Sequence, residues 1–262
     1  MSYYNSNNGV NDGFQPLTSN PLLMVPLETR NKTMTRCWME MGMALVITAL
    51  VSIVGAYSGF YLKLMASGAG MLIAIITMIV LLVMTVVISA GTSEGGGRLA
   101  KMKPSTARLC LYVYAALMGF SLTSVFYAYD IKTVGVAFGV SALYFFALAV
   151  YGYFCKKDLT SLGPIFLVML LVLLISEIVI FIFFPNPKML MIINAVGLVL
   201  FSVLTVMDVQ QAQKLMLDAA SRGEDAVVKM SINCALSLYL DFINIFLYLL
   251  RIFGVANASS RD

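Results

Sequence analysis

Seven long apolar segments alternate with short polar ones along the chain. They cover residues 37–62, 70–90, 107–129, 134–155, 162–184, 189–209 and 231–254. A helix needs about 20 residues to cross the ~30 Å hydrocarbon core of a bilayer, and every segment reaches that length. Several connections are only a few residues long, as at 130–133 and 185–188, so neighbouring segments must run antiparallel. The pattern predicts an all-α polytopic membrane protein, a bundle of seven transmembrane helices.

Polar composition marks the two ends of this bundle. Residues 1–30 are rich in Asn, Ser, Gly and Pro and lack apolar periodicity, which predicts a disordered cytoplasmic tail. Residues 31–256 hold all the apolar segments and leave no room for a separate soluble domain, and residues 257–262 form a short tail. We find no internal repeat, so an inverted-repeat transporter is not favoured.

The last apolar segment, residues 231–254, carries one polar stripe along an otherwise apolar helix. The stripe consists of Ser237, Asp241, Asn244, Tyr248 and Arg251. Steps of four and three residues place these side chains on one face of a helix. Lipid cannot satisfy a carboxylate or an amide, so this face must lie against other helices or a hydrated cavity. We therefore predict that the last helix lies at the centre of the bundle.

Composition supports a membrane protein and narrows its chemistry. The chain is 60% hydrophobic and 11% charged, far from the average soluble domain. It contains no histidine, which removes the commonest zinc ligand and the Ser/His and Cys/His pairs of hydrolases. The cysteines are far apart and lack CxxC spacing, so we interpret them as small buried hydrophobic residues. They are Cys37, Cys110, Cys155 and Cys234. We expect no enzymatic activity and no tightly bound cofactor.

The distribution of Lys and Arg predicts the orientation in the membrane. Most of the 17 basic residues lie in the N-terminal tail or in the connections after the second, fourth and sixth segments. By the positive-inside rule these parts face the cytoplasm, and the C-terminus lies outside unless the last segment is re-entrant. The Asn-rich tail and the short loops favour a bacterial inner membrane, and an endoplasmic reticulum membrane is the alternative.

Two carboxylates lie at similar depth within the apolar segments. Asp241 is about ten residues into the last segment, near the midplane, and Asp208 is close to the cytoplasmic end of the sixth. They differ in depth by about 6 Å and are within side-chain reach if their helices face each other. At low dielectric such a pair shares one proton, so its ionisation responds to pH without a histidine. A purely structural role stays open for both, as a buried anchor or an interfacial carboxylate.

The deprotonated pair also offers hard oxygen ligands to a cation such as Ca²⁺. Asp208, Asp241 and Asn244 supply fewer than the ~6–8 oxygen ligands of a tight calcium site. We therefore expect weak and transient calcium binding, which suits an ion in transit.

The last segment carries the most specific sequence signal. Residues 235–254 read ALSLYLDFINIFLYLLRIFG, and the sixth segment ends in MDVQ at residues 207–210. Both stretches resemble the Bax inhibitor-1 family of membrane proteins, whose signature is Tyr-Leu-Asp-(Phe/Ile)-(Ile/Val)-Asn, an apolar run and Leu-Leu-Arg. The resemblance covers roughly residues 30–256 and excludes the first part of the chain.

The resemblance implies a fold and an activity. The expected fold is a bundle with the last helix at its centre, and the expected activity is a pH-regulated calcium leak gated by two aspartates. By motif these map onto Asp208 and Asp241, the pair that the depth argument reached. The family also has an arginine latch near the junction of the second and third segments, where Arg98 and Lys101 are the candidates.

Three functional hypotheses follow. The leading one is a non-enzymatic, proton-gated cation leak with calcium as the favoured ion. The alternative is a membrane regulator that binds protein partners in cell death or membrane-protein quality control. An intramembrane aspartyl protease fits poorly, because its Gly-x-Gly-Asp and Tyr-Asp motifs are absent around Asp208 and Asp241. The expected partners are bilayer lipids, protons, calcium ions and membrane proteins, with no nucleic acid.

Overall fold

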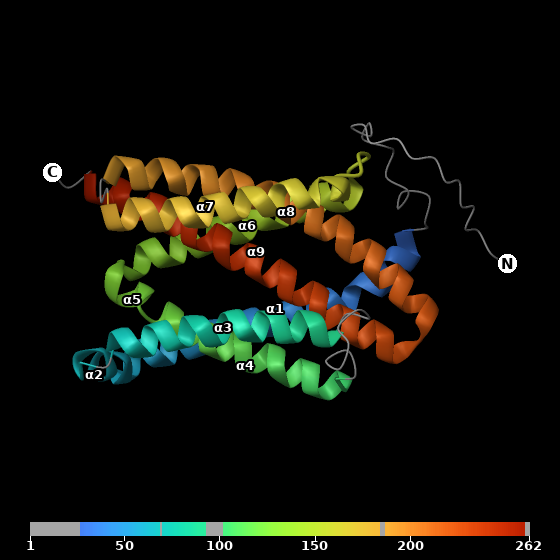
Figure 1. Cartoon of the computed structure of the whole chain (residues 1–262), viewed down its shortest axis with the longest axis horizontal. Helices are drawn as coiled ribbons and strands as arrows, with labels where there is room; N and C mark the ends of the chain where they lie inside the picture. The colour runs from blue at the N-terminus through green and yellow to red at the C-terminus, as the bar shows by residue number, and fades with distance from the viewer. Residues whose placement is uncertain (1–26, 69, 93–101, 184–186, 260–262) are drawn as a thin grey trace.

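A computed structural model describes residues 27–68, 70–92, 102–183 and 187–259 of the 262-residue chain. Its helices, labelled in Figure 1, are α1 (Leu27–Ser58), α2 (Phe60–Ala66), α3 (Gly70–Thr92), α4 (Pro104–Leu122), α5 (Val125–Ala128), α6 (Ile131–Phe154), α7 (Gly163–Phe183), α8 (Pro187–Arg222) and α9 (Glu224–Ser259). A short 3₁₀ helix, Thr160–Leu162, precedes α7. Seven helical stretches in the described residues are long and apolar enough to cross a membrane, which confirms the predicted all-α polytopic fold.

The helices form two layers with α9 between them (Figure 1). One layer holds α1, α3 and α4, the other holds α6, α7 and α8, and α9 runs diagonally from one to the other. More than half of the most apolar stretch of α9 is buried, 56%, against 6% for α3 and for the span that includes α7. The prediction that the last helix is central is therefore confirmed.

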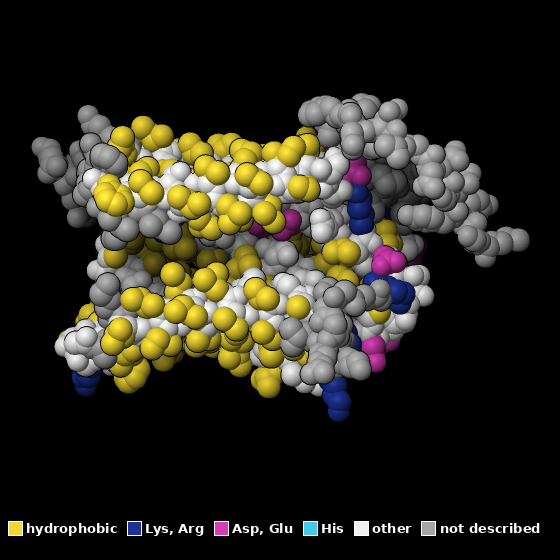
Figure 2. Space-filling view, in the orientation of Figure 1, with side chains coloured by type: hydrophobic (Ala, Val, Ile, Leu, Met, Phe, Trp, Pro, Cys, Tyr) yellow, Lys and Arg dark blue, Asp and Glu magenta, His cyan; other side chains and the backbone are white. Residues whose placement is uncertain are grey.

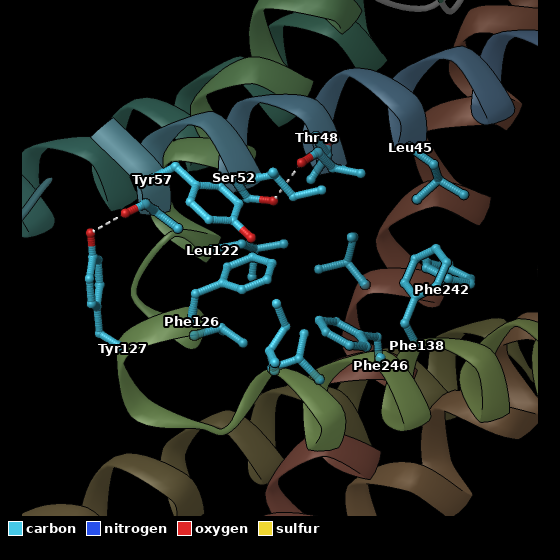
Figure 3. Close-up of a pocket in the computed structure, with 18 residues that line it drawn as sticks. Leu45, Thr48, Ser52, Tyr57, Leu122, Phe126, Tyr127, Phe138, Phe242 and Phe246 are labelled. Carbon is cyan, nitrogen blue, oxygen red and sulfur yellow. Dashed lines mark hydrogen bonds between the residues drawn. The ribbon is translucent and has the colours of Figure 1, made fainter. Parts of the chain in front are cut away.

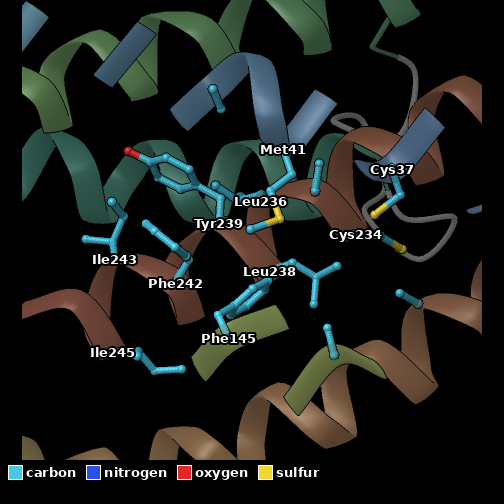
Figure 4. Close-up of a cluster of buried hydrophobic side chains, with 14 of the residues drawn as sticks. Cys37, Met41, Phe145, Cys234, Leu236, Leu238, Tyr239, Phe242, Ile243 and Ile245 are labelled. Carbon is cyan, nitrogen blue, oxygen red and sulfur yellow. The ribbon is translucent and has the colours of Figure 1, made fainter. Parts of the chain in front are cut away.

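The core is built around α9. Its side chains alternate between partners in both layers: Tyr239 faces Tyr114 of α4, and Phe242 meets Phe145 of α6 edge to face at 5.6 Å. Figure 4 shows this buried cluster, with Met41 of α1 beside α9. On the outside, hydrophobic side chains cover α3 and α7 (Figure 2), as expected of surfaces in contact with lipid.

Two glycines allow helices to approach closely. A Cβ atom at Gly119 of α4 would lie 2.6 Å from the carbonyl oxygen of Thr48 on α1. A Cβ atom at Gly152 of α6 would lie 2.8 Å from the carbonyl oxygen of Val206 on α8. Since backbone atoms cannot move aside as a flexible side chain can, both crossings depend on the missing side chain.

The first helix begins earlier than the sequence pattern indicates. The pattern assigns residues 27–30 to the tail, but they form the first turn of α1. Arg30 is buried, and its guanidinium donates hydrogen bonds to Gln213 of α8, at 2.9 Å from Nε, and to the carbonyl oxygen of Tyr153. It also stacks on the Tyr153 ring at 4.3 Å. These distant partners stabilise a turn whose local sequence carries no apolar signal.

The connection between the sixth and seventh predicted spans is also helical. The pattern predicts a loop over residues 210–230, yet α8 and α9 have 36 residues each and are interrupted only at Gly223, where φ is 109°. Each helix is about 54 Å long, well beyond the ~30 Å hydrocarbon core. The extension persists because Gln213, Met216 and Ala219 bury their side chains against neighbouring helices.

Candidate functional site

Asp241 lies in the middle of α9 and is 5% exposed. Its Oδ2 atom is buried and accepts no hydrogen bond from the described residues. The Thr205 side chain of α8 is within hydrogen-bonding reach of the carboxyl group, and the charge of Asp208, one turn further along α8, also acts on it. The structure therefore brings together the two carboxylates that the sequence singled out.

Asp208 lines a small cavity of about 100 Å³ between α8 and α9. The other lining residues are Gln211, Ala212 and Leu215 of α8 and Asn233, Cys234 and Ser237 of α9. Ser237 precedes Asp241 by one helical turn, so the cavity and the buried carboxylate follow one another along the same face of α9. Gln211 is exposed, so the lining extends from the buried interior to the surface of the helix pair.

The polar stripe of α9 serves different contacts along its length. Asn244 bonds to the Leu240 carbonyl oxygen of its own helix at 2.9 Å. Tyr248 donates to Glu177 of α7 at 2.9 Å, and the Arg251 guanidinium lies 3.9 Å from the same carboxylate. The stripe thus joins the carboxylate pair to a separate polar cluster at the far end of the bundle.

The candidate latch residues, Arg98 and Lys101, lie outside the described residues. A different ion pair involves α4: the exposed Arg108 lies 2.7 Å from the buried Glu40 of α1, which also accepts a hydrogen bond from Tyr112 at 2.9 Å. These partners are 68 and 72 residues apart in sequence, so no local pattern could have predicted the cluster.

A second polar cluster fixes the connection between α6 and α7. Lys214 of α8 lies 2.6 Å from Asp158, and Thr160 donates to the same carboxylate at 2.7 Å. Burial alone would raise the pKa of Asp158, but the hydrogen bonds from Lys214 and Thr160 outweigh it and hold that pKa below its usual value. Gln210 of α8 also stabilises this connection, because its side-chain amide donates a hydrogen bond to the Lys157 carbonyl oxygen at 2.8 Å.

The geometry of the central site sets what it can do chemically. Two carboxylates at low dielectric cannot both ionise cheaply, so a cation that bound here would compete with a proton for the same oxygens. Ser237, Asn233 and Gln211, whose side chains carry hydroxyl or amide oxygens, line the cavity beside Asp208. Among the described residues no group of three or more His, Cys, Asp and Glu side chains could hold a metal ion. Any cation here would depend on neutral oxygen ligands and water.

Comparison with known proteins agrees with the fold and the signature. The family model described as "Inhibitor of apoptosis-promoting Bax1" matches residues 30–258. The chain belongs to the Bax inhibitor-1 family. Inner membrane protein YbhL of Escherichia coli is 32% identical over 83% of this chain and 88% of its own length. Uncharacterized protein YrjE of Lactococcus lactis is 33% identical over 88% of this chain and 94% of its own.

Membership of the Bax inhibitor-1 family fits the extent of the described bundle. The matched region begins at Arg30, the buried residue in the first turn of α1, and it includes both Asp208 and Asp241. It therefore contains every helix of the two layers and excludes only the chain ends.

Proposed function

We propose that this protein is a pH-regulated cation leak of a bacterial inner membrane, with calcium as the favoured ion and with Asp208 and Asp241 as its gate. The observation that carries the proposal is the buried Asp241 carboxylate, which has an oxygen without a partner among the described residues and lies close enough to Asp208 of the neighbouring helix for the two charges to interact. A buried carboxylate without full hydrogen bonding is costly and is rarely kept for stability alone.

The gate follows from the competition between protons and cations. When the pair holds a proton, one carboxyl group donates toward the other and the packed α8–α9 interface stays closed. When the proton leaves, like charges face each other at low dielectric, and either the helices separate or a cation enters. The cavity beside Asp208 supplies the neutral oxygen ligands that such a cation needs. We place the N-terminus in the cytoplasm, so the cavity of Asp208 lies on the cytoplasmic side.

The test is calcium flux into dye-loaded proteoliposomes that contain the purified protein, across pH 6 to 8. Asp208→Asn and Asp241→Asn remove one carboxylate each, and we expect each to flatten the pH profile of the flux. Asp218→Asn is the matched control, because Asp218 is an exposed carboxylate on the same helix, α8. It should leave the profile unchanged.

Two outcomes would contradict the proposal. Absence of flux above empty liposomes at every pH, from protein that is shown to be folded, would overturn the leak and favour the partner-binding role. Flux that keeps its pH profile in both aspartate variants would show that Asp208 and Asp241 do not form the pH-sensitive gate.

A further inference from the structure

A cavity of about 530 Å³ lies between α1, the α4–α5 turn, α6 and α9 (Figure 3), in the half of the bundle that carries α2 and α5 (Figure 1). It is separate from the small cavity of Asp208, and no residue lines both. Buried side chains of α9 form its floor, with Phe242 3% and Ile243 4% exposed. Tyr127 of α5 bonds to the Ala56 carbonyl oxygen of α1 at 2.8 Å and closes one end.

The lining excludes ions and strongly polar ligands. None of the lining residues is Asp, Glu, Lys or Arg. The two small hydroxyl groups on α1 are already engaged: Thr48 donates to Ala115 at 2.9 Å, and Ser52 donates to Ala49 at 3.0 Å. On the facing wall, Phe138 of α6 packs edge to face against Phe242 and Phe246 of α9. Water would find few partners here, so the cavity favours an apolar occupant.

The rim of the cavity belongs to the surface that contacts lipid. Tyr57 of α1 is 80% exposed and Ile131 of α6 is 60% exposed, and both lie within predicted membrane spans. Exposed apolar side chains on helices long enough to span a membrane therefore frame the cavity, so in a bilayer its rim would border lipid. A cavity of about 150 Å³ takes up benzene, so about 530 Å³ has room for an apolar chain of well over ten carbons.

We propose that this cavity is a binding site for one acyl chain of a membrane phospholipid, which enters from the bilayer between α1 and α6 and packs on Phe242 and Phe246 of α9. A chain that leaves the bilayer for this site exchanges one apolar environment for another. It fills a void whose lining would otherwise lack contacts. The site does not depend on the leak, because none of its residues belongs to the carboxylate pair.

The structure provides a matched pair of variants to test the site. Gly135 lines the cavity, whereas Gly139, one turn along α6, does not. At both glycines, the position that a Cβ atom would occupy has no other atom within 4 Å. Each position therefore has room for the Cβ atom of a larger residue. Gly135→Phe fills the cavity, and Gly139→Phe adds the same side chain outside it. Ala56→Phe fills the cavity from the facing wall. It replaces Gly135→Phe in the test if gel filtration shows that Gly135→Phe does not fold.

The experiment uses the full-length protein in liposomes that contain a phospholipid with a photoreactive group within one acyl chain. After irradiation and digestion, mass spectrometry compares labelling of the buried floor residues of α9, Phe242 to Phe246, with labelling of the lipid-facing helix α3. We expect floor labelling in the unaltered protein, a decrease of about fivefold or more in Gly135→Phe because the ring excludes the chain, and no decrease in Gly139→Phe.

Labelling confined to α3 and other lipid-facing surfaces would overturn the proposal, because the floor residues are then out of reach of lipid. Floor labelling that persists unchanged in both Gly135→Phe and Ala56→Phe would also overturn it. The experiment measures lipid labelling and not ion flux. A negative result here would therefore leave the proposed leak untouched, and the absence of a leak would leave this proposal untouched.

Discussion

Asp241 is held by packing rather than by a complete set of hydrogen bonds. One carboxylate oxygen has no partner among the described residues, while Thr205 approaches the carboxyl group from α8. In contrast, Glu40 is paired with Arg108 and Tyr112, and Asp158 with Lys214 and Thr160. Glu40 and Asp158 thus have hydrogen-bond partners that the buried oxygen of Asp241 lacks. Asp241 lies in the signature sequence, which is why we assign the function to it.

Lys214 and Asp158 allow a pH prediction at the level of a single pair. The pKa of Asp158 is below its usual value in the folded protein, so its stabilising contribution is present above the unfolded pKa of about 3.9 and is lost as pH falls through the lower, folded value. Lys214→Met keeps the apolar stem and removes the charge. It should destabilise the protein by roughly 1–2 kcal/mol at neutral pH and by less near pH 3, which is below the unfolded pKa of Asp158.

Thermal unfolding in detergent at the two pH values measures this difference. Lys156→Met is the control, because Lys156 is an exposed basic residue of the same connection. An equally large effect of Lys214→Met at both pH values would show that its packing, and not the charge pair, stabilises the connection.

At the level of elements, the sequence predicted which helices exist better than where they end. Apolar length alone identified the seven spans, and the stripe on the last one identified its central position. The ends depended on contacts that are distant in sequence. Arg30 donates a hydrogen bond to Gln213, which is 183 residues away in sequence. This contact, and not the local helix propensity, holds Arg30 in α1. The apolar cavity likewise arises from several separate helices and has no signature of its own.

Gly119 tests how closely α1 and α4 must pack. Gly119→Ala places a Cβ atom 2.6 Å from the Thr48 carbonyl oxygen, so the helices must separate, and we expect a loss of about 1–3 kcal/mol of stability. Gly139→Ala on α6 meets no atom within 4 Å and gains helix propensity, so it should be neutral or stabilising by about 0.5–1 kcal/mol. Unfolding midpoints of the two variants in one detergent provide the comparison. Equal effects would mean that the close crossing is not needed.

At the level of the whole molecule, the two ends of the bundle differ in their content of Lys and Arg. The end with the first turn of α1 holds an ion pair between Arg36 and Glu224, together with the exposed Lys156 and Lys157. The end with α2 and α5 holds fewer basic residues, among them Lys63. A membrane protein whose ends differ in this way inserts with the basic end in the cytoplasm. In the orientation that we propose, the cavity of Asp208 faces the cytoplasm, and the acyl-chain site lies in the opposite half.

Orientation can be measured with single cysteines introduced into a variant whose four native cysteines are replaced by serine. Ser67, after α2, and Lys157, after α6, are both exposed and lie at opposite ends of the bundle. With a membrane-impermeant maleimide, Ser67→Cys should react in intact spheroplasts, whereas Lys157→Cys should react only after lysis, because we propose that the basic end faces the cytoplasm. The reverse pattern would place the cavity of Asp208 on the outer side, and the gate would then sense external rather than cytoplasmic pH.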